Sequence, residues 1–215
     1  MPDPQKLTVI CLALGQIVID DRYLLTANRE QYRKSGTRTW EPPGEVIETL
    51  ASDMHQLGKL LGAKSPGESA ILHFSIPEGN LRATTKWFGA RKPDVEGSHQ
   101  VIIRHLASDW RGNEPLLLHP GLIRANVAYL GWSWLAISIP LPGPQPNRMT
   151  HYFVRVFRLS PQAKAIDAIR RELALPNSPL ALVTTEEIAA GRTTSGEAIA
   201  PLAMHLAQPQ HPYTP

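Results

Sequence analysis

Four basic side chains between residues 28 and 39 are the groups of this chain best suited, by type and spacing, to hold an anionic ligand. A guanidinium presents a planar fork of N–H donors that matches phosphate oxygens, and an ammonium supplies a compact positive charge. The neighbouring residues are polar, which predicts a loop. The segment either contacts the phosphates of a ligand or is an ordinary solvated loop, and its basic residues are Arg29, Arg33, Lys34 and Arg38.

Two tryptophans form a second candidate. Trp132 and Trp134 lie two positions apart in a segment rich in aromatic and β-branched residues. This composition predicts a strand, in which alternate side chains share a face. The pair either stacks on a nucleobase or packs in the core, which is the commoner place for aromatic side chains.

Charge and composition narrow the function classes. The formal net charge of +3 suits an anionic ligand, but no dense run of Lys and Arg indicates nucleic-acid binding.

Cys11 is the only cysteine, so an intrachain disulfide is excluded, and its apolar neighbours predict a small buried side chain rather than a nucleophile. No stretch approaches the roughly 18 apolar residues of a membrane helix, and Met1 to Lys6 shows no signal-peptide pattern. We therefore expect a cytoplasmic protein without membrane contact.

Common catalytic motifs do not occur in the sequence. There is no phosphate-binding P-loop, no G-x-G-x-x-G and no G-x-S-x-G, and the eight histidines show no zinc-ligand spacing with cysteine. Because these motifs are absent, the sequence gives no support to a P-loop nucleoside triphosphatase, a dinucleotide-binding dehydrogenase, a serine hydrolase or a zinc protein.

The elements that must position the candidate residues mix strands and helices without regular alternation. This order predicts an α/β protein of the α+β type, with a mixed sheet between helices. We expect a hairpin at the N-terminus that turns at Asp20-Asp21, and a first helix whose leucines and Met54 follow helical spacing. The expected strands are 7–19, 22–27, 70–76, 100–106, 129–139, 151–159 and 180–183. Two helices are expected at 49–61 and 161–173. Two more are expected to begin at capping boxes, a short one at Thr184-x-x-Glu187 and a final one that runs from Thr194-x-x-Glu197 to about Leu206.

The segment from Leu7 to Gly62 carries three distinctive phrases. They are Leu24-Leu25-Thr26-Ala27-Asn28-Arg29, then Trp40-Glu41-Pro42-Pro43-Gly44-Glu45-Val46-Ile47-Glu48, and then His55-Gln56-Leu57-Gly58-Lys59-Leu60-Leu61-Gly62-Ala63. With these phrases the segment resembles the first half of a Nudix hydrolase domain, and the third phrase falls on the R-E-U-x-E-E-x-G-U part of the Nudix box, in which U is an aliphatic residue. The phrase Leu180 to Ile188 is similar to a later strand of the family and to the T-x-E-E-h phrase that follows it, in which h is a hydrophobic residue.

This sequence departs from the family in the carboxylates that bind magnesium. Lys59 and Leu60 stand at the paired glutamates, and His55 and Gln56 at the preceding Arg-Glu. Mg²⁺ requires oxygen ligands, which neither a lysine nor a leucine supplies. The remaining candidates, if the protein is catalytic, are Glu45, Glu48, Asp53 and His55, with Glu45 and Glu48 as weak metal ligands.

The resemblance therefore implies a degenerate Nudix domain that binds a nucleotide or another phosphate-bearing small molecule as a sensor or regulatory protein, without hydrolysis. Lys59 would then join the basic loop and the two tryptophans as a ligand-binding residue. No cofactor is expected, and Mg²⁺ only if hydrolysis survives. Two alternatives stay open: a divergent Mg²⁺-dependent hydrolase of nucleoside diphosphate derivatives, and a scaffold that binds a partner protein or a second copy of the chain.

The expected domain organisation is a single unit. It spans residues 1–207, with a segment atypical of the family at about 64–120, and it is followed by a polar, proline-bearing tail at 208–215 that we expect to be frayed.

Overall fold

The structure of the chain, a computed structural model, describes residues 6–28, 36–46, 73–77, 79, 81–90, 92–107, 124–139 and 148–212. Within these residues the strands form two mixed sheets. The larger has six strands in the order β11-β7-β8-β1-β5, with β6 also paired to β1. Its strands are β1 (Lys6–Gln16), β5 (Gly44–Val46), β6 (His73–Pro77), β7 (Asn126–Ile139), β8 (Arg148–Ser160) and β11 (His211–Pro212).

The smaller sheet has five strands in the order β10-β4-β3-β2, with β9 paired to β3. The predicted hairpin is confirmed, since β2 and β3 pair antiparallel across Asp20 and Asp21, which take φ values of 50° and 58°. Two successive left-handed residues give the turn that matches the twist of a hairpin. The strands are β2 (Val18–Ile19), β3 (Arg22–Ala27), β4 (Thr39–Glu41), β9 (Leu180–Val183) and β10 (Ala198–Ile199).

The strand β1 is buried on both faces because its alternate residues enter two different cores. Cys11 and Ala13 belong to a core that also holds Phe88 and Ile102, whereas Leu12 and Leu14 belong to a second core with Leu206. Alternation of side chains along a strand explains this division. A continuous apolar run, which cannot reveal two faces by itself, is the sequence pattern of such a doubly covered strand.

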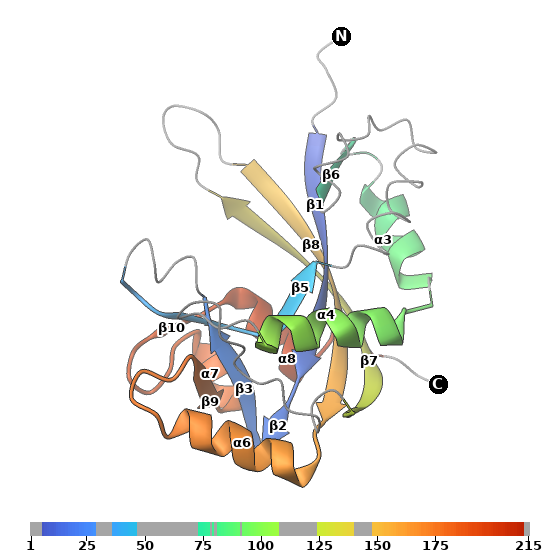
Figure 1. Cartoon of the computed structure of the whole chain (residues 1–215). Helices are drawn as coiled ribbons and strands as arrows, with labels where there is room; N and C mark the ends of the chain where they lie inside the picture. The colour runs from blue at the N-terminus through green and yellow to red at the C-terminus, as the bar shows by residue number, and fades with distance from the viewer. Residues whose placement is uncertain are drawn as a thin grey trace.

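Helices cover both faces of the larger sheet. Helix α4 crosses β1, β5, β7 and β8 on one face, and α8 contacts β1 and β8 on the other (Figure 1). The predicted fold class, α/β of the α+β type, is confirmed, although the strands form two mixed sheets where one was expected. The helical elements are α3 (Leu81–Ala90), α4 (Val95–Ala107), α6 (Ala163–Leu173), α7 (Thr185–Ala190), the 3-10 turn η3 (Pro201–Ala203) and α8 (Met204–Ala207).

The prediction of a strand at 100–106 is wrong, because these residues lie in α4. The run Val101-Ile102-Ile103 has the composition of a strand, but Ser98, Val101 and Ile102 are buried at helical spacing. Phe88 and Ile102 join the same core as β1, so the segment that the sequence set apart as atypical supplies part of this core.

Two boundary predictions are also wrong. Strand β8 continues to Ser160, and the following helix has Gln162 at its N-cap position instead of Ser160. Thr194 to Glu197 form a turn before β10, and the helix expected there begins only after Ala200. In the tail that was expected to be frayed, His211 and Pro212 pair with β7.

The predicted helix at 49–61, with Leu57 and Leu61, lies outside the described residues. Among the helices that the structure does describe, none has the length and apolar character needed to cross a membrane.

Candidate functional site

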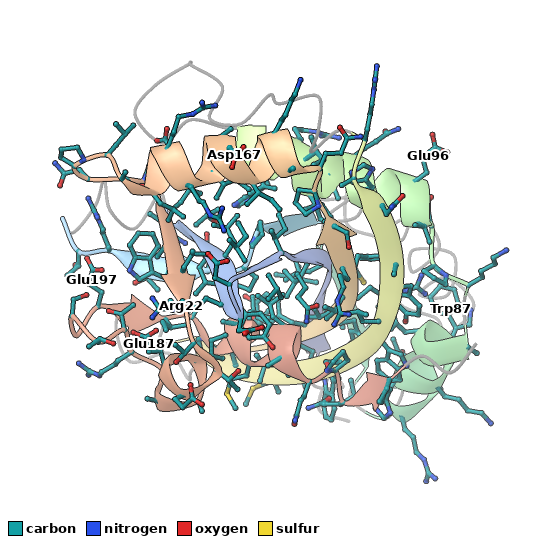
Figure 2. The ribbon with its side chains drawn as sticks, turned by 90° about the horizontal axis from the view of Figure 1, so that it is seen from below. Arg22, Trp87, Glu96, Asp167, Glu187 and Glu197 are labelled. Carbon is teal, nitrogen blue, oxygen red and sulfur yellow. The ribbon has the colours of Figure 1, made fainter. Side chains whose placement is uncertain are left out.

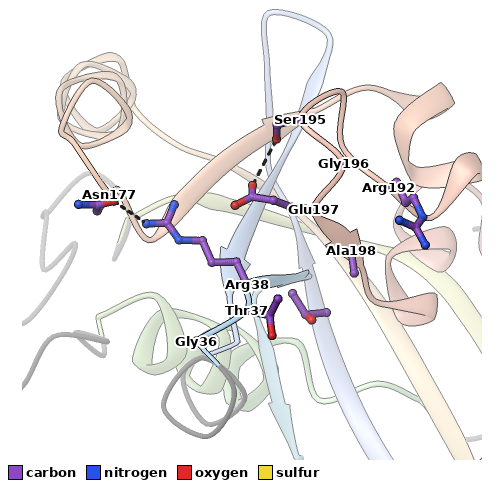
Figure 3. Close-up of a pocket in the computed structure, with 10 residues that line it drawn as sticks. Gly36, Thr37, Arg38, Asn177, Arg192, Ser195, Gly196, Glu197 and Ala198 are labelled. Atoms are coloured by element: carbon purple, nitrogen blue, oxygen red, sulfur yellow. Dashed lines mark hydrogen bonds between the residues drawn. The ribbon is translucent and has the colours of Figure 1, made fainter.

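A polar pocket of about 700 Å³ lies where three segments distant in sequence meet, and we call it the arginine pocket (Figure 3). One wall is the segment that leads into β4, together with the first residue of that strand. The second wall is the turn after α6, and the third is the turn between α7 and β10. Its lining residues are Gly36, Thr37, Arg38, Thr39, Asn177, Arg192, Ser195, Gly196, Glu197 and Ala198.

The position of Arg38 follows from the strand that begins beside it. The carbonyl of Thr39 accepts a hydrogen bond of 2.7 Å from the amide of Asn28, and β4 then pairs with β3. The Arg38 Nη2 donates to Oδ1 of Asn177 at 3.2 Å, and the guanidinium carbon lies 5.8 Å from the centre of the Trp40 ring. Contact with an aromatic face and a side-chain amide together restrict the rotamers of Arg38 at the pocket wall.

The turn from Gly191 to Ala198 carries the second arginine. Helix α7 ends at Gly191 with a φ of 67°, the left-handed conformation that glycine adopts without a steric penalty. The amide of Thr193 then donates to the carbonyl of Glu197 at 2.9 Å, which closes a short loop. This loop presents Arg192 and Ser195 to the pocket.

Glu197 ties this turn to β4. Its Oε2 accepts a hydrogen bond from Trp40 Nε1 at 2.8 Å and a longer one from Ser195 Oγ at 3.5 Å. Within the part of the lining that the structure describes, the ionisable groups are Arg38, Arg192 and Glu197, and their formal charges sum to +1. The arrangement favours an anion over a cation, and the hydroxyl and amide groups of the lining add hydrogen-bond donors.

Hydrogen bonds from the N-terminus of α7 also hold the turn between α7 and β10. Thr184 and Glu187 form the predicted capping box, with Thr184 N donating to Glu187 Oε2 at 2.9 Å and Glu187 N donating to Thr184 Oγ1 at 3.2 Å. The other oxygen, Oε1, accepts from both the amide and the hydroxyl of Thr194 at 2.6 Å. One carboxylate thus joins the start of the helix to the turn that follows it.

The environment of Glu187 favours its ionised form. Partial desolvation raises its pKa, but hydrogen bonds from Thr194 and Thr184, together with the nearby charge of Arg22, lower the pKa below the usual range overall. Arg22 and Glu187 come from neighbouring elements and lie side by side in Figure 2. The ionised carboxylate is the stronger acceptor for the donors around it.

Of the sequence-predicted ligand residues, Arg38 lies in the arginine pocket, whereas Trp132 and Trp134 line a different pocket of about 510 Å³. The two pockets have no lining residue in common. The tryptophans also contribute to packing, because both contact the core around β1.

Arg192, Asn177, Ser195 and Glu197 were not predicted as site residues. The pattern Thr194-x-x-Glu197 predicted the start of a helix and not a turn. Arg192, Ser195 and Glu197 reach the pocket through the turn before β10, which pairs in parallel with β4 and aligns Ala198 with Thr39. Asn177 lies in the turn before β9, which pairs with β3.

Most of the predicted catalytic and metal-binding residues lie outside the described residues. Glu45 lies in β5 opposite Ala13, and only its backbone is described. No group of three or more His, Cys, Asp or Glu side chains suited to a metal ion occurs within the described ranges. The predicted residues that lie outside them are Arg29, Arg33, Lys34, Glu48, Asp53, His55 and Lys59.

Comparisons with known proteins give little further guidance. No protein-family model matches the sequence, and no curated protein matches it either. The solution structure of the E. coli ORF135 protein is similar at 14% sequence identity and a TM-score of 0.31, over 93% of this chain and 86% of that chain. A similarity at this level carries no argument about the fold or the function of this chain.

Proposed function

We propose that this chain binds a phosphate-bearing small molecule, such as a nucleotide, in the arginine pocket and acts as a sensor or regulatory protein of the cytoplasm. The observation that carries the proposal is the placement of Arg38 and Arg192 on different walls of one polar pocket of about 700 Å³. This volume falls within the roughly 300–1,000 Å³ common for small-molecule sites. Two arginines around one pocket suit the several oxygens of a phosphate group.

The proposal includes a degenerate Nudix domain as the scaffold. Its support is the resemblance of the sequence phrases around Leu24, Trp40 and Leu57, together with the loss of the family's paired carboxylates at Lys59 and Leu60. Under this proposal the pocket binds its ligand without a divalent metal, because arginines replace the cation as the partner of the phosphate.

The direct test is calorimetric titration of the purified protein with pyrophosphate, ADP, ATP and ADP-ribose, with and without Mg²⁺. A ligand present at about 100 times its dissociation constant should also raise the free energy of unfolding by about 2.7 kcal/mol in a thermal-shift or denaturant measurement. We expect binding that does not require Mg²⁺.

Variants then locate the binding. Arg38→Ala and Arg192→Ala should each weaken the affinity for the best ligand about tenfold or more, since a hydrogen bond to a charged group contributes about 1.5–3 kcal/mol. Arg171→Ala is the matched control, because Arg171 lies exposed on α6 and does not line the pocket. Unchanged affinity in both pocket variants, or no phosphate compound that binds, would exclude this function for the pocket.

A further inference from the structure

A second pocket, of about 510 Å³, lies between α3 and β7, far in sequence from the arginine pocket. We call it the tryptophan pocket. Its walls are mostly apolar, and among the described residues that line it the charged side chains, Arg82 and Lys86, both come from the helix. The lining residues are Leu81, Arg82, Thr85, Lys86, Trp132, Trp134 and His211.

The geometry of α3 and β7 explains why these residues face one another. Arg82 and Lys86 are four positions apart on α3, so they lie on one side of the helix, one turn apart. Trp132 and Trp134 are two positions apart on β7 and share a face of the sheet. A cationic helix side therefore stands beside an aromatic sheet face.

The Trp132 ring is held by close packing. A Cβ atom on Gly89 would lie 2.6 Å from this ring, so α3 approaches it as only a glycine permits. Phe88 meets the ring edge-on at 5.6 Å between centroids, and the His211 imidazole stacks on it at 4.1 Å with an interplanar angle of 21°. The wall formed by Trp132 is thus ordered before any ligand arrives.

Trp134 is fixed by hydrogen bonds. Its indole N–H donates to His151 Nδ1 at 3.1 Å, and its backbone N–H donates to Gln210 Oε1 at 2.9 Å. Gln210 is itself held, because its amide donates to Ser133 Oγ at 2.8 Å. The indole N–H of Trp134 is already engaged, so Trp134 offers the pocket an apolar aromatic surface and no donor.

The charge of the lining selects among ligands. Among the described residues of the lining, Arg82 and Lys86 carry two positive charges and none is a carboxylate. A small inorganic anion would leave the aromatic wall without a partner, whereas a neutral ring would not use the cations. An aromatic molecule with an acidic substituent satisfies both, because its ring packs on the indoles while its anion reaches the helix side.

We propose that the tryptophan pocket is a second ligand site, which takes a planar aromatic molecule carrying an anionic group. Trp132 and Trp134 bind the ring and Arg82 and Lys86 bind the anion. This site is independent of the phosphate-binding function proposed above, since the two pockets share no lining residue.

Three probes of one shape separate the contributions. Naphthoate, naphthylmethanol and naphthylmethylammonium have the same ring system and differ in charge. We expect the anion to bind most tightly and the cation least, with at least about a fivefold difference between anion and neutral probe, because partly exposed ion pairs each contribute modestly. In NMR spectra the indole N–H signals of Trp132 and Trp134 should shift on addition of naphthoate, while that of Trp40 at the other pocket should not.

The double variant Arg82→Ala/Lys86→Ala changes only exposed helix side chains, so the fold should remain intact. It should lower the affinity for naphthoate to that for naphthylmethanol. Arg38→Ala, at the other pocket, should leave naphthoate binding unchanged even where it abolishes phosphate binding. Equal affinity for the three probes, full naphthoate affinity in the double variant, or signal shifts at Trp40 in place of Trp132 and Trp134 would each overturn the proposal.

Discussion

At the scale of single residues, Cys11 is the one thiol of the chain, and it lies on β1 at 2% exposure. Burial raises its pKa from the ordinary 9.0 to about 12, against a smaller opposing effect of the Arg155 charge. Since the thiolate is the reactive form, we expect native protein at pH 8 to resist a thiol reagent that labels it completely in denaturant. Rapid stoichiometric labelling of the native protein would contradict this burial.

The hydrogen bond between Trp40 and Glu197 is a second residue-scale feature with a measurable effect. Trp40 is 3% exposed, and its indole N–H donates to Glu197 at 2.8 Å. Trp40→Phe should lower the free energy of unfolding by about 1–3 kcal/mol, because the partly buried carboxylate loses its donor. Urea unfolding measures the change.

A matched pair of variants at the acceptor isolates this bond. Glu197→Gln keeps an oxygen that can accept from the indole and should be much less destabilising than Glu197→Ala. Equal stability of these two variants, or a Trp40→Phe protein as stable as the unaltered chain, would show that the bond contributes nothing.

At the scale of elements, the start of α7 depends on a capping box whose carboxylate is ionised. Thr184→Ala should cost about 1 kcal/mol of stability by removing the cap. The depressed pKa of Glu187 adds a pH dependence of known sign. A carboxylate whose pKa is lower in the folded state stabilises the fold above its ordinary value of 4.5, and this contribution is lost as the pH falls toward the folded-state pKa.

Glu187→Gln tests that pH dependence. Because the amide does not titrate, the difference in unfolding free energy between the original and the variant protein should be larger at pH 7 than at pH 4. Urea titrations at the two pH values give the comparison. A difference that is constant with pH would mean that the hydrogen bonds of Glu187 do not depend on its charge.

The bulge in β7 lies where the short strand β11 pairs with it. The register shifts between Tyr129 and Gly131, where φ is +140°, and a Cβ on Gly131 would lie within 2.3 Å of the His211 carbonyl oxygen. Gly131→Ala should therefore separate β11 from β7. Hydrogen exchange of the Gln210 and His211 amides should accelerate, while the amides between β1 and β8 keep their protection. Unaltered exchange at His211 would show that the pairing tolerates a side chain.

At the scale of the whole molecule, the sequence predicts that this protein is not a magnesium pyrophosphatase. Under the Nudix resemblance proposed above, Lys59 and Leu60 stand at the positions of two glutamates, which would change the local formal charge from −2 to +1. A unit charge about 4 Å from a metal changes its binding by roughly 4 kcal/mol at an effective dielectric of about 20. Turnover of ADP-ribose, dinucleotides or nucleoside triphosphates in millimolar Mg²⁺ or Mn²⁺ should stay below about 0.1 per second, under the usual range for enzymes. Faster turnover would show that other residues bind the metal.

The sequence predicted those parts of the fold whose pattern is local. Strands β3, β7, β8 and β9 follow from short apolar and aromatic runs, and the cap at Thr184 follows from a capping box. Helix α4 was missed because Val101-Ile102-Ile103 prefers a strand, and only burial against Gly15 and its neighbours decides for the helix. Arg38 was found as a basic residue in a polar segment. Its neighbours could not be found, since Asn177 and the residues from 192 to 198 reach it only through the pairing of β9 with β3 and of β10 with β4.

The position of β1 inside the larger sheet, between β8 on one side and β5 and β6 on the other, has a consequence for the newly made chain. Its parallel partner β8 aligns Thr8 with Thr150, and Gln16 donates to the carbonyl of Leu206, 190 residues away. During synthesis the 11-residue strand β1 therefore stays unpaired on the side of β8 until most of the chain has been made. Such long-range pairing slows folding and exposes a strand edge to other nascent chains. We expect truncations that end before residue 148 to aggregate, and the full chain to refold in a slow phase whose yield falls as protein concentration rises.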